Sequence, residues 1–163
     1  MIGTSEASMS KSITRVKAAL EAAGVESEIL RMGNETRTAQ AAAHEANCDI
    51  DQIAKSIIFR GGTSSKAILF ITAGGRQVDA EKATMLAGET LGRADAVFVR
   101  AQTGFAIGGV APVGHLNKPS AFFDPRLLDF EVVYAAAGTP HHIFSISPTK
   151  LLEISQSQLT VFV

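Results

Sequence analysis

Glycine and proline are concentrated in one stretch of the chain, Gly108-Gly109-Val110-Ala111-Pro112-Val113-Gly114-His115. Glycine permits positive φ and lets a ligand approach the backbone closely, while proline fixes φ and offers no donor. A loop of this kind can direct its remaining N–H groups at one point, as an anion or a developing oxyanion requires. The same composition is also typical of an ordinary turn. The spacing is not that of a phosphate-binding or dinucleotide-binding loop, which excludes those two classes.

A lysine interrupts an apolar segment earlier in the chain. Lys55 lies within Ile-Ala-Lys-Ser-Ile-Ile-Phe, residues 53–59. If this segment is a strand, Lys55, Ile57 and Phe59 share one face, because successive side chains alternate. Lysines are rarely fully buried without a partner. The pattern leaves two interpretations open: an exposed lysine whose stem lies along apolar surface, or a cation that faces a pocket.

Four segments follow one another in an order that matches a known family. They are residues 38–43, residues 53–59, residues 109–114, and residues 137–140 followed by residues 147–152. They resemble, in turn, a Thr-x-x-x-Ala-Ala helix start, a lysine-bearing strand entry, a Gly-x-x-Pro-x-Gly loop, and a Gly-Ser/Thr-Pro turn with its closing helix. On these motifs the chain, over roughly residues 10 to 163, resembles the YbaK/ProX aminoacyl-tRNA deacylases. That family is related to the editing (insertion) domain of bacterial prolyl-tRNA synthetase.

The resemblance implies a trans-acting editing hydrolase that deacylates mischarged aminoacyl-tRNA. Water would attack the ester between the amino acid and the terminal adenosine, with no protein nucleophile, and a ribose hydroxyl of the substrate would help to place it. The lysine at the position of Lys55 contacts the substrate end of the tRNA in the resembling family. Donors aimed at the carbonyl oxygen lower the barrier, and we expect them near Gly108, Gly109 and Val110, or near Gly114.

The remaining site residues are expected to bind substrate. They are Met32, Thr38, Pro112, Gly114, His115, Gly138 and Thr139. The expected partner is the acceptor end of an aminoacyl-tRNA, with association with a tRNA synthetase as a further expectation. Oligomeric state is left open between a monomer and a weak dimer. Two alternatives also stay open: a non-catalytic module that binds a tRNA end or a small ligand, and an enzyme that acts on a small ester or amide.

We expect neither a metal nor a cofactor. His115, His141 and His142 could act as general bases or ligands, but adjacent histidines on a strand point to opposite faces, which argues against a shared metal. The one cysteine, Cys48, fits a small apolar side chain better than a nucleophile. A single cysteine also suits a reducing compartment, so we expect a cytoplasmic protein.

Composition favours one soluble globular domain. The chain has 163 residues, 46% apolar residues, 19% charged residues and a net charge of −1. There is no run of apolar residues long enough to cross a membrane. Near-neutral charge argues against binding nucleic acid by bulk charge, although it permits contact with only the end of a tRNA. We expect a flexible N-terminus over residues 1–10 and one domain over residues 11–163.

Periodicity and capping residues predict an α+β fold. Helices or helical turns are expected at residues 10–24, 36–46, 49–54, 79–87, 102–106, from 124, and 147–155. Strands are expected at residues 25–32, 56–60, 67–72, 96–99, 121–123, 131–136, 143–146 and 159–163, with a hairpin around residues 61–65. The predicted architecture is a single domain with a curved, mixed, barrel-like β-sheet flanked by helices.

Overall fold

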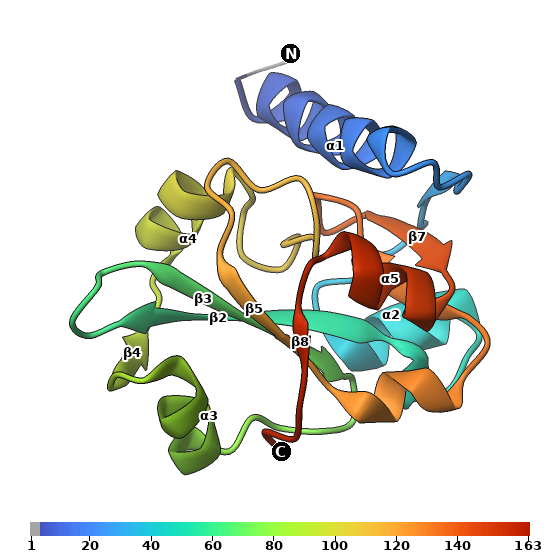
Figure 1. Ribbon diagram of the computed structural model, residues 1–163. Helices are drawn as coiled ribbons and strands as arrows, with labels where there is room; N and C mark the ends of the chain where they lie inside the picture. The colour runs from blue at the N-terminus through green and yellow to red at the C-terminus, as the bar shows by residue number, and fades with distance from the viewer. Residues whose placement is uncertain (1–3) are drawn as a thin grey trace.

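The computed structural model describes the backbone of residues 4–163 and the side chains of residues 11–163. The helices are α1 (Thr4–Ala22), α2 (Ala39–Ala46), α3 (Ala80–Ala87), α4 (Ala96–Thr103) and α5 (Pro148–Ile154), with 3-10 turns η1 (Ile50–Gln52) and η2 (Pro125–Asp129) (Figure 1). The strands are β1 (Ile29–Arg31), β2 (Ala54–Gly61), β3 (Ala67–Ala73), β4 (Leu91–Arg93), β5 (Ser120–Phe123), β6 (Val133–Ala136), β7 (His142–Ile146) and β8 (Gln158–Leu159). The predicted α+β class is therefore confirmed.

The strands form two sheets. One is antiparallel with the order β1-β7-β6, and the other is mixed with the order β4-β2-β3-β5-β8. In the second sheet β3 pairs with β5, and β5 with β8, in parallel. A single parallel bridge between Ile53 and Tyr134 joins the two sheets just before β2 begins. The expected mixed sheet thus takes the form of two sheets joined beside β2, and closure into a barrel stays a prediction.

β3 is the central strand of the core and is buried along its whole length. Leu69 and Ile71 pack into the larger hydrophobic cluster, while Ile68 and Phe70 pack into a second cluster on the opposite face. A strand covered on both faces reads as a continuous apolar run, which is why residues 67–73 carry no polar alternation. The expected hairpin with β2 is confirmed, with Ala54 opposite Ala73 and Arg60 opposite Ala67.

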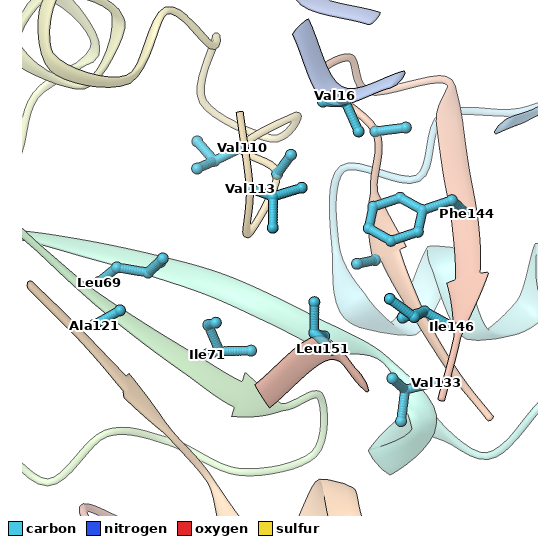
Figure 2. Close-up of a cluster of buried hydrophobic side chains, with 14 of the residues drawn as sticks. Val16, Leu69, Ile71, Val110, Val113, Ala121, Val133, Phe144, Ile146 and Leu151 are labelled. Atoms are coloured by element: carbon cyan, nitrogen blue, oxygen red, sulfur yellow. The ribbon is translucent and has the colours of Figure 1, made fainter. Parts of the chain in front are cut away.

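The glycine-rich loop is anchored in this core. Val110 and Val113 belong to the larger cluster, and Figure 2 shows them beside Leu69 and Ile71. Burying two valines fixes the loop between its glycines, because each apolar side chain removed from water contributes about 1.5–3 kcal/mol. The loop is therefore held against the sheet at both of these positions.

The expected strand at residues 96–99 is wrong, because these residues form the start of α4. Asp95 caps the helix, its Oδ1 accepting from the amide of Phe98 at 2.8 Å. Phe98, Val99 and Thr103 are buried while Val97 is 80% exposed, which is a helical and not an alternating pattern. The expected helical segment at residues 102–106 is also wrong, since residues 102–103 end α4 and Gly104 is its C-cap.

The ends of the chain differ from expectation as well. α1 begins at Thr4, six residues before the helix expected at residues 10–24. Residues 1–3 lie outside the described residues, and flexibility of residues 1–10 stays a prediction. The last strand stops at Leu159 and does not reach residue 163. Phe162 is buried against Phe70 instead, with ring centroids 5.0 Å apart.

Candidate active site

A cavity of about 410 Å³ lies where α2, β2, β6 and the glycine-rich loop meet. Its size falls within the range of small-molecule sites, about 300–1,000 Å³. Most of its wall is apolar and includes Ala42, Ile58, Val99, Val110, Ala135 and Ile143. Polar groups reach it at few positions, which is the usual arrangement of a site that orients one ligand.

The first wall is the start of α2. Thr38 is the N-cap residue, and its Oγ1 accepts a hydrogen bond from the amide of Ala41 at 3.1 Å. Such a cap satisfies one of the unpaired donors of the first helical turn. Ala39 and Ala42 then face the cavity with small side chains, which leaves room beside β2.

The second wall is the loop at Ile107, Gly108 and Val110. Gly108 has a φ of +89°, a conformation that L side chains rarely adopt. The amide of Gly109 donates to the carbonyl of Ala106 at 3.0 Å and closes a turn within the loop. Within the part of the chain that the structure describes, the amides of Gly108 and Val110 have no hydrogen-bond acceptor. These two N–H groups are therefore available to a ligand.

The loop rests on the turn that follows β6. A Cβ built on Gly109 would lie 2.6 Å from the Cα of Thr139, so only glycine fits there. Thr139 is buried, and its Oγ1 is 2.5 Å from Nδ1 of His142. Gly138 has a φ of +99° and lies against the backbone of Ser12. These contacts hold the loop from behind.

Lys55 lies on β2, where it lines the cavity together with Thr38, Gly108 and Val110. Its ammonium donates to the carbonyls of Gly74, at 3.2 Å, and Arg76. Burial lowers the pKa of Lys55, while the nearby carboxylates Asp51 and Asp124 act in the opposite direction. The predicted cleft shared by Lys55 and the glycine-rich loop is therefore present, with the ammonium held by main-chain carbonyls.

Comparison with known proteins identifies the family that shares these elements. The family model described as "Aminoacyl-tRNA editing domain" matches residues 33–154, which include α2, β2, the glycine-rich loop and β6. The chain belongs to this family. The editing domain is 30% identical over 136 residues to "Uncharacterized protein YwhH" of Bacillus subtilis (strain 168), a match that covers 83% of this chain and 86% of that protein.

Two solved structures have the same fold. One is described as a putative trans-editing enzyme for prolyl tRNA synthetase; it is 39% identical, with a TM-score of 0.86, over 93% of this chain and 96% of that one. The other is a scaffold protein used for epitope backbone grafting, 37% identical with a TM-score of 0.85 over the same shares of the two chains. The resemblance to the editing family, first drawn from four short motifs, is thereby confirmed.

Several predicted binding residues of the editing domain lie outside this cavity. Pro112, Gly114 and His115 line a separate hollow of about 250 Å³ beside Ala19 and Lys118. His115 Nε2 is 2.7 Å from the carbonyl oxygen of Ala111, and burial lowers its pKa, with that contact acting in the opposite direction. The structure thus places His115 as a half-buried residue that contacts the loop through the Ala111 carbonyl.

Three further positions support the cavity without lining it. Gly109 and Thr139 pack against each other behind the loop. Met32 donates its amide to the carbonyl of His141 at 2.7 Å, which ties the end of β1 to the turn before β7. Among the described residues that line the cavity, Met32, Gly138 and Thr139 are absent.

Most of the residues that line the cavity were not predicted from the sequence, and Ser56 and Arg37 are two polar examples. Ser56 lines the cavity with a buried Oγ that has no hydrogen-bond partner within the described residues. Arg37 covers Gly108, since a Cβ on Gly108 would lie 2.5 Å from its Cγ. Strand alternation from Lys55 would have placed Ser56 on the opposite face, so its position at the cavity follows only from the unpaired edge of the strand. No sequence pattern marks Arg37.

The described part of the editing domain holds neither a cluster of metal-ligating side chains nor a membrane-spanning helix. No group of three or more His, Cys, Asp or Glu side chains could hold a metal ion there. Its described helices include none that is long and apolar enough to span a bilayer.

Proposed function

We propose that this editing domain is a trans-acting deacylase that hydrolyses the ester between an amino acid and the terminal adenosine of a mischarged tRNA. The observation that supports this most is the cavity, in a member of the aminoacyl-tRNA editing family. Lys55 lines this cavity together with Gly108 and Val110, whose amides have no hydrogen-bond acceptor within the described chain. Because a binding site also needs such donors, membership of the editing family is what favours hydrolysis over binding alone.

Catalysis in this proposal depends on stabilising an oxyanion. Water adds to the ester carbonyl, negative charge develops on its oxygen, and the carbon–oxygen bond to the ribose then breaks as that oxygen takes up a proton. The amides of Gly108 and Val110 are the donors, and losing one such donor typically costs about 2.7–4 kcal/mol of transition-state stabilisation. Gly109, whose amide closes the turn at Ala106, keeps these two donors in place.

Lys55 holds the substrate end in this mechanism. An ammonium has three protons, and the carbonyls of Gly74 and Arg76 accept two of them. The third remains for a phosphate or ribose oxygen of the terminal adenosine. Fixed by two carbonyls, the cation is pre-oriented and loses little freedom when substrate binds. A ribose hydroxyl of the substrate helps to place the water, as the family resemblance implies.

The other expected binding residues have supporting roles in this proposal. Thr38 shapes the entrance through the start of α2, and Arg37 offers a half-exposed guanidinium beside Gly108, 3.7 Å from Glu35. We propose that Met32, Pro112, Gly114, His115, Gly138 and Thr139 position the loop and its neighbouring turns without contacting the acyl group.

The test is a panel of aminoacyl-tRNAs, each incubated with the wild-type protein and with Lys55→Met and Lys55→Arg. We expect hydrolysis of at least one mischarged tRNA, with most of the activity lost in Lys55→Met. Lys82→Met is the matched control, because Lys82 bonds the carbonyl of Val163 away from the cavity. Binding of tRNA without hydrolysis of any member would contradict the proposal and favour the non-catalytic alternative. Hydrolysis of small esters alone would favour the other alternative, an enzyme that acts on a small ester or amide.

We further propose that the protein acts in the cytoplasm, on tRNA released by a synthetase. A similar structure is described as a putative trans-editing enzyme for prolyl tRNA synthetase. Adding purified prolyl-tRNA synthetase to the deacylation assay tests this. Faster clearance of mischarged tRNA with the synthetase present would support association, and an unchanged rate would contradict it.

A further inference from the structure

β2 has one edge that is paired along its length and one that is not. On the first edge every residue from Ala54 to Arg60 lies opposite a residue of β3. On the second edge β4 pairs only with residues 59–61, and the bridge to Tyr134 lies at Ile53. Among the described residues, no strand covers the second edge between these two points.

Alternation decides which residues point to the open edge. The amide of Gly61 donates to the carbonyl of Lys66, on the β3 side, at 2.9 Å. The amide of Gly62 donates to the carbonyl of Thr90, on the β4 side, at 2.7 Å. In an antiparallel pair the N–H and C=O of one residue point the same way and those of the next residue point the opposite way. The register with β3 continues without a bulge. Counting back along β2, the main-chain groups of Ser56 and Ile58 therefore face the open edge.

The cavity lies at this edge. Ala94 would face Ile58 if β4 continued, but β4 ends at Arg93, and both Ala94 and Ile58 line the cavity. Ser56 also lines it, and its buried Oγ has no partner in the described chain. Buried polar groups in native proteins are nearly always hydrogen-bonded. Ser56 thus places a hydroxyl without a hydrogen-bond partner, and main-chain groups on an edge that no described strand ladder pairs at this residue, in an apolar wall, which points to a ligand with matching polar groups.

We propose that Ser56 binds the main-chain part of the aminoacyl group as a neighbouring strand would. Its N–H donates to the ester carbonyl oxygen, and its C=O accepts from the α-amino group. Two residues directly opposite each other in an antiparallel pair exchange two such hydrogen bonds, one in each direction. The amino group and the carbonyl oxygen of a single aminoacyl group have the spacing needed for both. The inference rests on the proposed function. It adds Ser56 as the residue that recognises the α-amino group and the ester carbonyl, which every aminoacyl ester has.

Ser56 is a binding and positioning group here and not a nucleophile. A serine nucleophile needs a general base within hydrogen-bond reach, and none of the described residues contacts its Oγ. The contact also leaves the amino acid side chain to the apolar walls of the cavity. Ser56 therefore recognises the amino and carbonyl groups common to all amino acids, and the apolar walls select among their side chains.

Hydrogen exchange measured by NMR tests the contact directly. The probe is the 3′-amide analogue of alanyl-adenosine, which is not hydrolysed as the ester is. In the free protein, the Ser56 amide should exchange faster than the amides of Ile57 and Phe59, which are bonded to β3. With the analogue at 100 times its Kd, exchange at Ser56 should slow by roughly a hundredfold, because only the unbound fraction exchanges. Adenosine alone should leave Ser56 unchanged.

A pair of variants gives an independent readout. Ser56→Ala removes the hydroxyl and keeps the edge N–H, whereas Ser56→Pro removes both without breaking a bond to β3, since proline is tolerated on a strand edge. Loss of an oxyanion donor lowers kcat by roughly a hundred- to a thousandfold, so Ser56→Pro should be slower than Ser56→Ala by at least tenfold.

The outcomes separate this inference from the proposed function. If the wild type deacylates tRNA but Ser56 exchange does not respond to saturating analogue, Ser56 recognition is wrong and the deacylase stands. If no aminoacyl-tRNA is hydrolysed and the analogue does not bind, the proposed function fails and the inference fails with it. Equal hydrogen-exchange rates for the amides of Ser56 and Ile57 in the free protein would also contradict the inference, because they would show that the Ser56 amide is as protected as one bonded to β3.

Discussion

Replacing Gly109 with alanine should displace the glycine-rich loop from the turn that supports it behind the cavity. The new Cβ would lie 2.6, 2.7 and 2.9 Å from the Cα, C and N atoms of Thr139. All three are backbone atoms, so no side chain can rotate away. Either the loop or the turn at Thr139 must move, and the movement needed for ordinary contact is on the order of 1 Å.

The magnitude follows from this overlap. Inserting a methyl group into a packed site costs about 1–3 kcal/mol. For a chain of this size each kcal/mol lowers the Tm by about 2–4 °C, so Gly109→Ala should melt about 2–12 °C below the wild type. A shift of 1 Å in catalytic groups can reduce the rate by about a hundredfold. Deacylation should therefore fall further than stability alone would explain.

The assay compares thermal unfolding and kcat/KM for Gly109→Ala with those for Gly33→Ala. A Cβ added at Gly33 would meet no atom within 4 Å, and Gly33 has no positive φ. Its replacement should therefore leave the Tm unchanged or raise it slightly, because alanine restricts the unfolded chain, an effect of about 0.4–1 kcal/mol. A Gly109→Ala protein with wild-type Tm and wild-type activity would refute the packing of the loop on Thr139.

Four further predictions follow from the site. Lys55→Met should lose at least about tenfold in kcat/KM and lower the Tm less than Gly109→Ala does, because water can replace the ammonium at the Arg76 carbonyl. Thr38→Val should lower the free energy of unfolding by about 0.5–2 kcal/mol in urea titrations, because it removes the cap of α2, whereas Thr38→Ser should not. Burial lowers the pKa of His115, so the folded protein binds fewer protons than the unfolded chain, and stability should fall as pH drops below about 6.5. Melting curves of wild type and His115→Gln between about pH 8 and pH 5 measure this, and equal slopes would contradict it. A chelator should leave deacylation unchanged; activity lost to it and restored by zinc would contradict a metal-free site.

Local signals in the sequence were sufficient for several elements. The helices expected at residues 36–46 and 79–87 are both present, and the side chains of their N-cap residues, Thr38 and Asp79, accept from amides of the first turn. The β2–β3 hairpin followed from two apolar runs around Gly61-Gly62. These features depend on residues close together in the chain, where hydrogen-bond and turn preferences are strong.

Local signals misled where tertiary packing competed with them. Residues 96–99 are apolar and β-branched, which favours a strand. Asp95 caps them as a helix, and burial of Phe98 and Val99 on one face stabilises that choice. The final segment likewise looked like a strand, but Phe162 is buried against Phe70 and the ladder ends at Leu159.

The sequence by itself determined the class of the fold, the family, and the presence of a lysine and a glycine-rich loop suited to one chemistry. Only the tertiary structure decided that Lys55 and Gly108 line one cavity while His115 lies outside it. It alone showed that β2 is left open at Ser56, because that edge depends on where β4 ends and where Tyr134 meets Ile53. Pairing between segments this far apart is set by the packing of the whole core, and no local pattern of residues carries it.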